Sequence, residues 1–142
     1  MTINEKQDAL IEDFEFLGEW EEKYKYIIDL GKDLPLIAED YKTEANLIRG
    51  CQSRVWLHVD YKDEKLSFTA DSDALITKGL VSMVVDVLSG HSPKEIVDAD
   101  IYFIDKIGLK SHLSPTRSNG LLSMLKQIKM YAVAYLSKSL QS

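Results

Sequence analysis

The sequence predicts an α+β fold in which a small antiparallel sheet is flanked by helices from both ends of the chain. Two observations lead to this class. Apolar residues recur at helical spacing before residue 31 and again after residue 114, and two segments between them alternate apolar and polar residues as strands do. Since no repeat, low-complexity stretch or linker divides the chain, we expect one domain over residues 1–142.

The spacing of apolar residues before residue 31 predicts two helices. Apolar residues have helical spacing up to Leu17, Gly18 interrupts the pattern, and the pattern resumes from Trp20 to Leu30. Residues 41–48 have no clear period, and Thr43 is a possible cap for a short turn there.

The middle of the chain predicts a hairpin followed by a helix. Residues 55–59 and 66–70 alternate apolar with polar side chains, which is typical of strands that bury one face, and we expect residues 61–64 to form the loop between them. Residues 71–73, Asp-Ser-Asp, are candidates for the N-cap of a helix with a broad apolar face over residues 75–88.

Two Ser-Pro pairs mark the remaining helix starts. Ser92-Pro93 and Ser114-Pro115 each place a capping residue before a first-turn proline. The first predicts a short helix, followed by a second short element at 101–107. The other predicts the start of the last helix, unless Asn119-Gly120 delays that start to Leu121.

The composition and charge of the chain argue against several classes of function and location. The chain has a net charge of −6 and no basic run, which argues against a general binder of nucleic acids. The acidic N-terminal residues do not fit a signal or transit peptide. The most apolar stretch, residues 80–88, is too short to span a membrane and contains Asp86. We therefore expect a cytoplasmic protein with neither nucleic acid nor membrane as a partner.

Cys51 is the only cysteine, so the chain cannot form an internal disulfide or a thiolate-rich metal site. It lies in the polar segment Arg49-Gly50-Cys51-Gln52-Ser53-Arg54. Gly50 permits a turn, and the two arginines bring positive charge near the sulfur, which favours the nucleophilic thiolate. This setting predicts an exposed, reactive thiol. The alternative is an inert, buried cysteine.

Three histidines are candidate bases for this thiol. His58 falls on the polar side of the first strand, and His91 is expected to be solvated after the helix that ends at Gly90. His112 is more suggestive because it stands in a polar, turn-rich segment, residues 111–120, before a helix N-terminus. No spacing of His, Asp or Glu predicts a metal site, and no glycine-rich loop predicts a nucleotide, so we expect no cofactor.

Four short groups of residues, spread along the chain, carry a resemblance to a known family by their identity and their order. They are Trp20-Glu21-Glu22-Lys23-Tyr24; Gly50-Cys51-Gln52-Ser53; Asp71-Ser72-Asp73-Ala74 with Lys78-Gly79-Leu80; and His112-Leu113-Ser114-Pro115 with Arg117-Ser118. Together they resemble the SufE family of sulfur acceptors over nearly the whole chain. The resemblance implies an α+β fold shared with IscU-type scaffolds.

The resemblance also implies roles for individual residues. Cys51 matches the cysteine that accepts sulfur as a persulfide, and Gln52 and Ser53 complete the signature around it. Asp73 and Arg117 match residues that shape the surroundings of the cysteine. Arg49, Gly50 and His112 are further supporting candidates.

Partners follow from the same resemblance. It implies a pyridoxal-phosphate cysteine desulfurase of the SufS type as sulfur donor and an iron–sulfur scaffold of the SufBCD type as recipient. The protein would then be a sulfur-transfer partner and activator of the desulfurase rather than a stand-alone enzyme. The sister CsdE branch with a CsdA-like desulfurase, a single-cysteine redox sensor, a Cys-His hydrolase and a homodimer stay open as alternatives.

Overall fold

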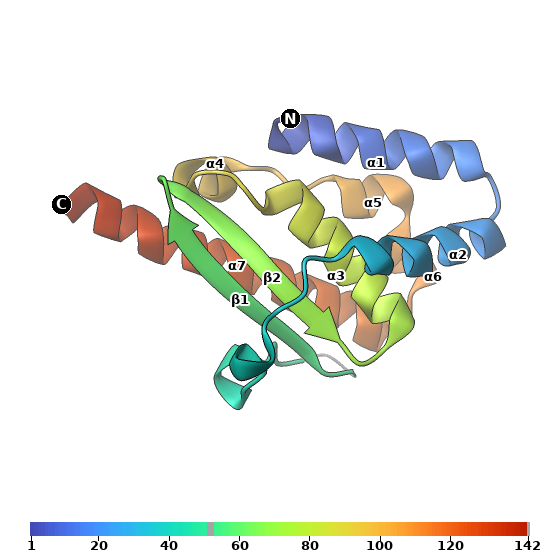
Figure 1. Cartoon of the computed structure of the whole chain (residues 1–142). Coiled ribbons are helices and arrows are strands. Elements are labelled where there is room, and N and C mark those ends of the chain that lie inside the picture. The colour runs from blue at the N-terminus through green and yellow to red at the C-terminus, as the bar shows by residue number, and fades with distance from the viewer. Residues whose placement is uncertain (51–52, 142) are drawn as a thin grey trace.

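The computed structural model describes residues 1–50 and 53–141, with side chains as far as residue 138. A two-stranded antiparallel sheet lies among helices that come from both ends of the chain (Figure 1). The predicted α+β class is confirmed. Among the described residues, no helix is both long and apolar enough to cross a membrane.

The first two helices form where the sequence predicts them. A capping box between Thr2 and Glu5 starts α1 (Ile3–Leu17), and Gly18 in a left-handed region of backbone space, with φ of 78°, separates it from α2 (Trp20–Leu30). Three single 3-10 turns then lead to the sheet: η1 (Gly31–Asp33), η2 (Glu39–Tyr41) and η3 (Glu44–Asn46).

The hairpin consists of β1 (Val55–Lys62) and β2 (Lys65–Ser72). Its turn has two residues, Asp63 and Glu64, both with positive φ, and not the four residues expected from the sequence. The predicted loop was too long because Tyr61 and Lys62 pair with β2. Two left-handed residues match the twist of a hairpin, but the usual Asn-Gly or Asp-Gly signal is missing here.

The outer edge of β2 is bonded to other parts of the chain. The backbone amides of Leu66, Phe68 and Ala70 donate to the His91 carbonyl, the Ser89 hydroxyl and the Pro35 carbonyl, at 2.8, 2.9 and 3.0 Å. Alternate residues of a strand direct their amides to the same edge. Segments before and after the hairpin in sequence therefore hold this edge.

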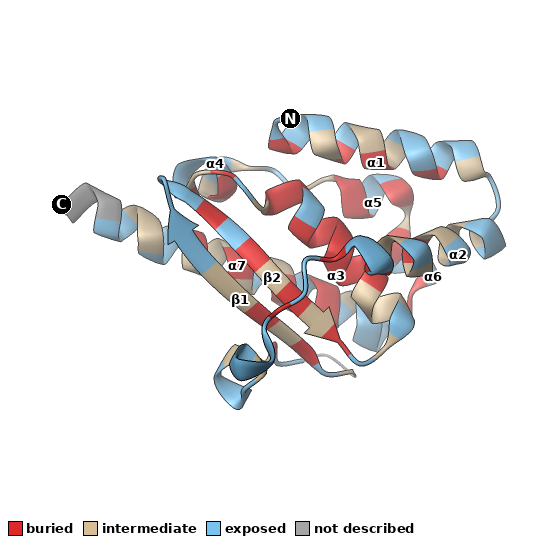
Figure 2. Cartoon of the chain, viewed as in Figure 1, coloured by how far each residue is buried: buried red, intermediate tan, exposed pale blue. Residues whose placement is uncertain are grey.

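The central helix is α3 (Leu75–Leu88), and most of its residues are buried (Figure 2). Its N-cap is Ala74, without a side-chain cap, so the prediction of a cap at 71–73 was wrong. Asp71 and Ser72 belong to β2 instead. Gly79 lets α3 approach α2, since a Cβ at this position would lie 1.9 Å from the carbonyl oxygen of Ile27.

The last helix begins at Pro115, as the Ser-Pro pair predicts, and Asn119-Gly120 lies within it. The Ser114 hydroxyl accepts a hydrogen bond from the Arg117 amide at 3.3 Å.

Lys129, further along the same helix, bonds the helix to the segment after Pro93. Its ammonium group donates to the carbonyl of Ile96 at 2.6 Å, and burial lowers the Lys129 pKa. The helices after α3 are α4 (Pro93–Asp98), α5 (Phe103–Ile107), α6 (Leu109–His112) and α7 (Pro115–Gln141).

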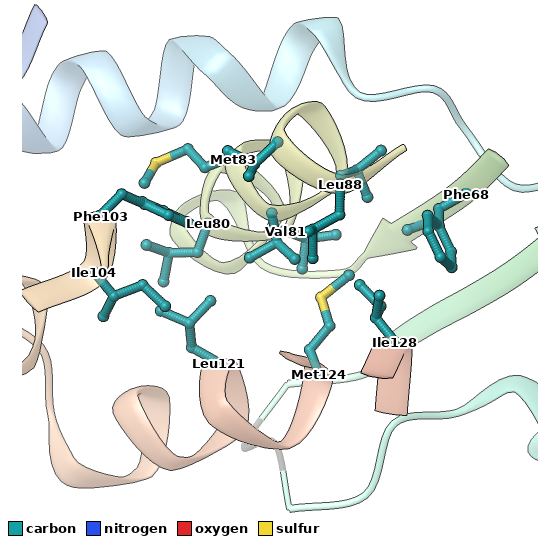
Figure 3. Packing of buried hydrophobic residues seen from close by; sticks show 14 of the residues in the cluster. Phe68, Leu80, Val81, Met83, Leu88, Phe103, Ile104, Leu121, Met124 and Ile128 are labelled. Atoms are coloured by element: carbon teal, nitrogen blue, oxygen red, sulfur yellow. The ribbon is translucent and has the colours of Figure 1, made fainter. Parts of the chain in front are cut away.

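The core lies where α3 meets the hairpin, α5 and α7. Figure 3 shows Phe68 of β2, Leu80 and Val81 of α3, and Met124 and Ile128 of α7 converging on one apolar region. This packing places the start of β1, the end of β2 and the first turns of α7 at one end of the core, where the candidate site is found.

Candidate functional site

The segment that carries the candidate thiol is a loop closed at its base. The amide of Ile48 donates to the carbonyl of Val55 at 2.8 Å, and residues 49–54 lie between these two positions. Cys51 and Gln52, both predicted site residues, lie outside the described residues. Their neighbours on either side are described and define the frame of the site.

Asp73 fastens the C-terminal side of this loop. Its Oδ1 accepts a hydrogen bond from the Arg54 amide at 3.0 Å, and its own amide donates to the Arg54 carbonyl at 3.3 Å. The contact forms because the antiparallel register places the start of β1 opposite the end of β2. Asp73, predicted from the resemblance, thus contacts the loop directly.

Gly50, on the N-terminal side of the loop, lies close to Ser123 of α7. Its φ is +88°, a region that other residues rarely adopt, and a Cβ at this position would lie 3.1 Å from the hydroxyl oxygen of Ser123. Glycine is therefore favoured here by its conformation, and a larger residue would also press on the Ser123 hydroxyl. Ser123 was not singled out in the sequence, because nothing marks one serine on a long helix as a neighbour of a distant loop.

Ser53 and Arg117 line one small cavity of about 20 Å³, room for about one water molecule. The other lining residues come from β1, α3 and α7 and are mostly apolar: Val55, Thr77, Leu80, Val81, Thr116, Gly120, Leu121 and Met124. Two predicted site residues from distant parts of the sequence are thus brought together. The two threonines were missed, although Thr116 adjoins Arg117.

His112 occupies a different environment. Its ring stacks on Trp20, with centroids 3.8 Å apart and planes inclined by 13°, and its Nδ1 lies 3.0 Å from the Gly108 carbonyl. The Tyr24 hydroxyl donates to the carbonyl of His112. These contacts join α2 to the turn before α7, and His112 does not line the cavity of Ser53 and Arg117.

The other histidines are engaged in local contacts. His58 stacks on Tyr41 with centroids 4.0 Å apart, and its Nε2 lies 3.3 Å from Asp60. His91 is only 8% exposed, so the expected solvated residue is in fact buried. The reason is the bond between its carbonyl and the β2 edge, which draws the residue against the sheet.

Near the loop, an aspartate is paired with lysines, whereas two arginines have no ion-pair partner among the described residues. Asp71 is held by the ammonium groups of Lys42 and Lys78, at 2.8 and 3.4 Å. Burial alone would raise the pKa of Asp71, but the hydrogen bonds from Lys42 and the Ser72 amide and the charges of both lysines lower it overall. Arg49 and Arg117, by contrast, are exposed and make no ion pair with any described residue.

The described part of the chain contains no group of three or more His, Cys, Asp or Glu side chains that could hold a metal ion.

Comparison with known families decides the classification. The family model for SufE, described as an Fe-S metabolism associated domain, matches residues 8–132. The chain belongs to the SufE family. It therefore belongs to a sulfur-transfer family of iron–sulfur metabolism.

Individual proteins agree with this assignment. An uncharacterized SufE-like protein of Rhizobium meliloti (strain 1021) is 47% identical over 130 residues, which cover 88% of this chain and 93% of the relative. Another from Rhizobium etli is 47% identical over 127 residues, with 86% of each protein covered. The solution structure of a hypothetical protein from Thermus thermophilus has the same fold, with a TM-score of 0.77, 20% identity and coverage of 93% of this chain and 96% of that one.

The SufE motifs meet in pairs in the structure. The Trp20 motif contacts the His112 motif through the ring stack, and the aspartate motif contacts the loop through Asp73 and Arg54. Arg117 and Ser53 share the small cavity. Asp73 and Arg117 thus both lie near the C-terminal side of the loop, whereas the ring stack joins α2 to the segment before α7.

Proposed function

We propose that this SufE-family protein accepts sulfur as a persulfide on Cys51 from a pyridoxal-phosphate cysteine desulfurase of the SufS type. It stimulates that desulfurase and passes the sulfur to an iron–sulfur scaffold of the SufBCD type. The observation that supports the proposal best is the frame around the thiol: a polar loop that is hydrogen-bonded to Asp73 on one side and lies close to α7 at Gly50 on the other.

The chemistry needs only one thiolate on this chain. The Cys51 thiolate attacks the outer sulfur of the desulfurase persulfide, a new S–S bond forms, and the donor cysteine leaves as a thiolate. A thiolate of the next acceptor repeats the exchange and releases Cys51. No external oxidant or reductant enters either step, and Cys51 is the only cysteine in the chain.

The surroundings support transfer better than hydrolysis. A Cys-His hydrolase needs an imidazole directed at the thiol. The ring of His112 instead stacks on Trp20 and its Nδ1 lies at the Gly108 carbonyl, and His91 is buried against the sheet. We further propose that residues 1–142 act as one SufE-like domain, because the buried core draws residues from Ile3 through Ala132. We also propose that this domain works in the cytoplasm, since its single cysteine gives no sign of an oxidising compartment.

Mass spectrometry tests the proposal. The purified protein is incubated with a SufS-type desulfurase and cysteine, and we expect Cys51 to gain one sulfur atom while cysteine turnover rises. Cys51→Ser should fold normally, gain no sulfur and give no stimulation. Stimulation by the Ser variant equal to that of the wild type would overturn the proposal. Repeating the assay with a CsdA-like desulfurase distinguishes the two branches of acceptors.

A further inference from the structure

A groove lies beside residues 49–54, which we call the thiol loop. It runs between the segment from η3 to Arg49 and the middle of α7. Its volume is about 420 Å³, and Leu47, Arg49, Lys126 and Met130 are among the residues that line it. A second hollow of about 370 Å³ shares Leu47 and Arg49 and extends to Arg54. We call the two hollows together the α7 groove. The teal turns beside β1 in Figure 1 carry the η3 side of it.

The α7 groove is positively charged although the chain as a whole is acidic. Arg49, Arg54 and Lys126 line it, against the single carboxylate of Glu44. The net charge of the chain is −6. Several lysines elsewhere are paired with carboxylates, such as Lys6 with Asp86 and Lys94 with Asp98. Within the described part of the chain, none of the three groove cations has a carboxylate partner.

The same groove offers apolar surface. Met130 is 55% exposed, and Leu47, which lines the same groove, is half-buried. Unbranched methionine adapts to differently shaped apolar side chains, and exposed apolar groups inside a polar rim are typical of interaction sites. The complementary ligand is therefore an acidic segment that also carries an apolar side chain.

We infer that the α7 groove binds an acidic, extended segment of the cysteine desulfurase and holds that enzyme over the thiol loop. The inference rests on the proposed function, which supplies the partner. Arg49 lines the groove and stands two positions before Cys51, so a protein that reaches the thiol from this side lies over the groove. A nucleic acid fits less well, because only three cations face the phosphates and the rest of the chain is acidic.

Charge reversal on α7 tests the inference without altering the thiol loop. Binding of the purified desulfurase is measured by calorimetry for the wild type, Lys126→Glu, Met130→Ser and the control Lys138→Glu. The control makes the same charge change on the same helix, at an exposed lysine that does not line the groove. All variants are first checked for wild-type unfolding curves and for alkylation of Cys51 by a small reagent.

We expect Lys126→Glu to weaken binding about tenfold at about 0.05 M salt, and less at about 0.5 M salt, where charges are screened. Met130→Ser should weaken it about threefold at both salt concentrations, because its contribution is apolar. Lys138→Glu should stay within about twofold of the wild type.

Equal effects of Lys126→Glu and Lys138→Glu would overturn the inference. So would sedimentation showing that the wild type is a dimer and that Lys126→Glu disrupts it, since the groove would then hold a second copy of this chain. Failure of the proposed function has a different signature: the wild type itself would gain no sulfur on Cys51 from the desulfurase.

Discussion

The carboxylate of Asp73 lies 3.0 Å from the backbone nitrogen of Arg54, across the junction between the hairpin and α3. Because the amide of Asp73 also donates to the carbonyl of Arg54, the two residues form a closed pair of hydrogen bonds. The last residue of the thiol loop is thereby held next to the residue that follows β2. The loop has a fixed end on this side.

Removing the Asp73 acceptor should loosen this end. We expect Asp73→Ala to lower the free energy of unfolding by about 1 kcal/mol, because the Arg54 amide loses its partner at an exposed position. Asp73→Asn keeps an acceptor oxygen and should be close to the wild type in stability. Urea unfolding gives the free energies, and persulfide formation on Cys51 shows whether transfer slows in the Ala variant. Equal stability of the two variants would show that the hydrogen bond is not what holds the loop.

Gly50→Ala should impair sulfur transfer more than stability. A left-handed backbone costs alanine about 1 kcal/mol, and the new methyl group would lie 3.1 Å from the Ser123 hydroxyl. Gly90→Ala is a matched control, since Gly90 has nearly the same φ, +85°, and nothing within 4 Å of a Cβ. Thermal unfolding should show similar losses for both variants. Only Gly50→Ala should slow persulfide formation, and equal transfer rates in the two variants would contradict this role for Gly50.

His112 should act through its ring stack. His112→Ala removes the contact with Trp20 and should lower the free energy of unfolding by about 1 kcal/mol, whereas His112→Phe keeps an aromatic ring and should recover part of it. We expect His112→Phe to accept sulfur on Cys51 at close to the wild-type rate. A folded Phe variant that accepts none would instead assign the imidazole a chemical role.

Asp71 should make the fold sensitive to acid. Its pKa is lowered on folding, so its carboxylate stabilises the fold above about pH 4 and this contribution is lost as the pH falls through the lower pKa of the folded state. We expect Asp71→Asn to be about 1–2 kcal/mol less stable than the wild type at pH 7, and the difference to shrink below pH 4. Urea unfolding at several pH values measures it. The exposed pair of Lys94 and Asp98 provides the control, Asp98→Asn, for which little change is expected.

The regular elements could be predicted because local rules determine them. The helix from Leu75 to Leu88 follows its apolar face, and Ser92-Pro93 and Ser114-Pro115 mark helix starts that the structure confirms. The hairpin was predicted in place but with too long a loop. Asp63 and Glu64 both take up left-handed conformations, which aspartate adopts at times but which glutamate does not signal.

Features that depend on contacts between distant segments could not be predicted. The Asp-Ser-Asp sequence looks like a helix cap, but pairing with β1 extends β2 through Ser72 and directs Asp73 to Arg54. Ser123 and Lys126 gain their importance only because α7 packs beside the thiol loop. The resemblance did indicate Asp73 and Arg117, and the structure places both beside residues that flank Cys51.

The bonded outer edge of β2 has a consequence for how this protein meets others. A free strand edge is a template on which any extended chain can add itself, which leads to aggregation and to recognition without sequence selectivity. Here the amides of Leu66, Phe68 and Ala70 are already occupied by the backbone and a side chain of the same molecule. The β2 edge is thus closed to backbone pairing at these three residues, and contacts on that side depend on side chains.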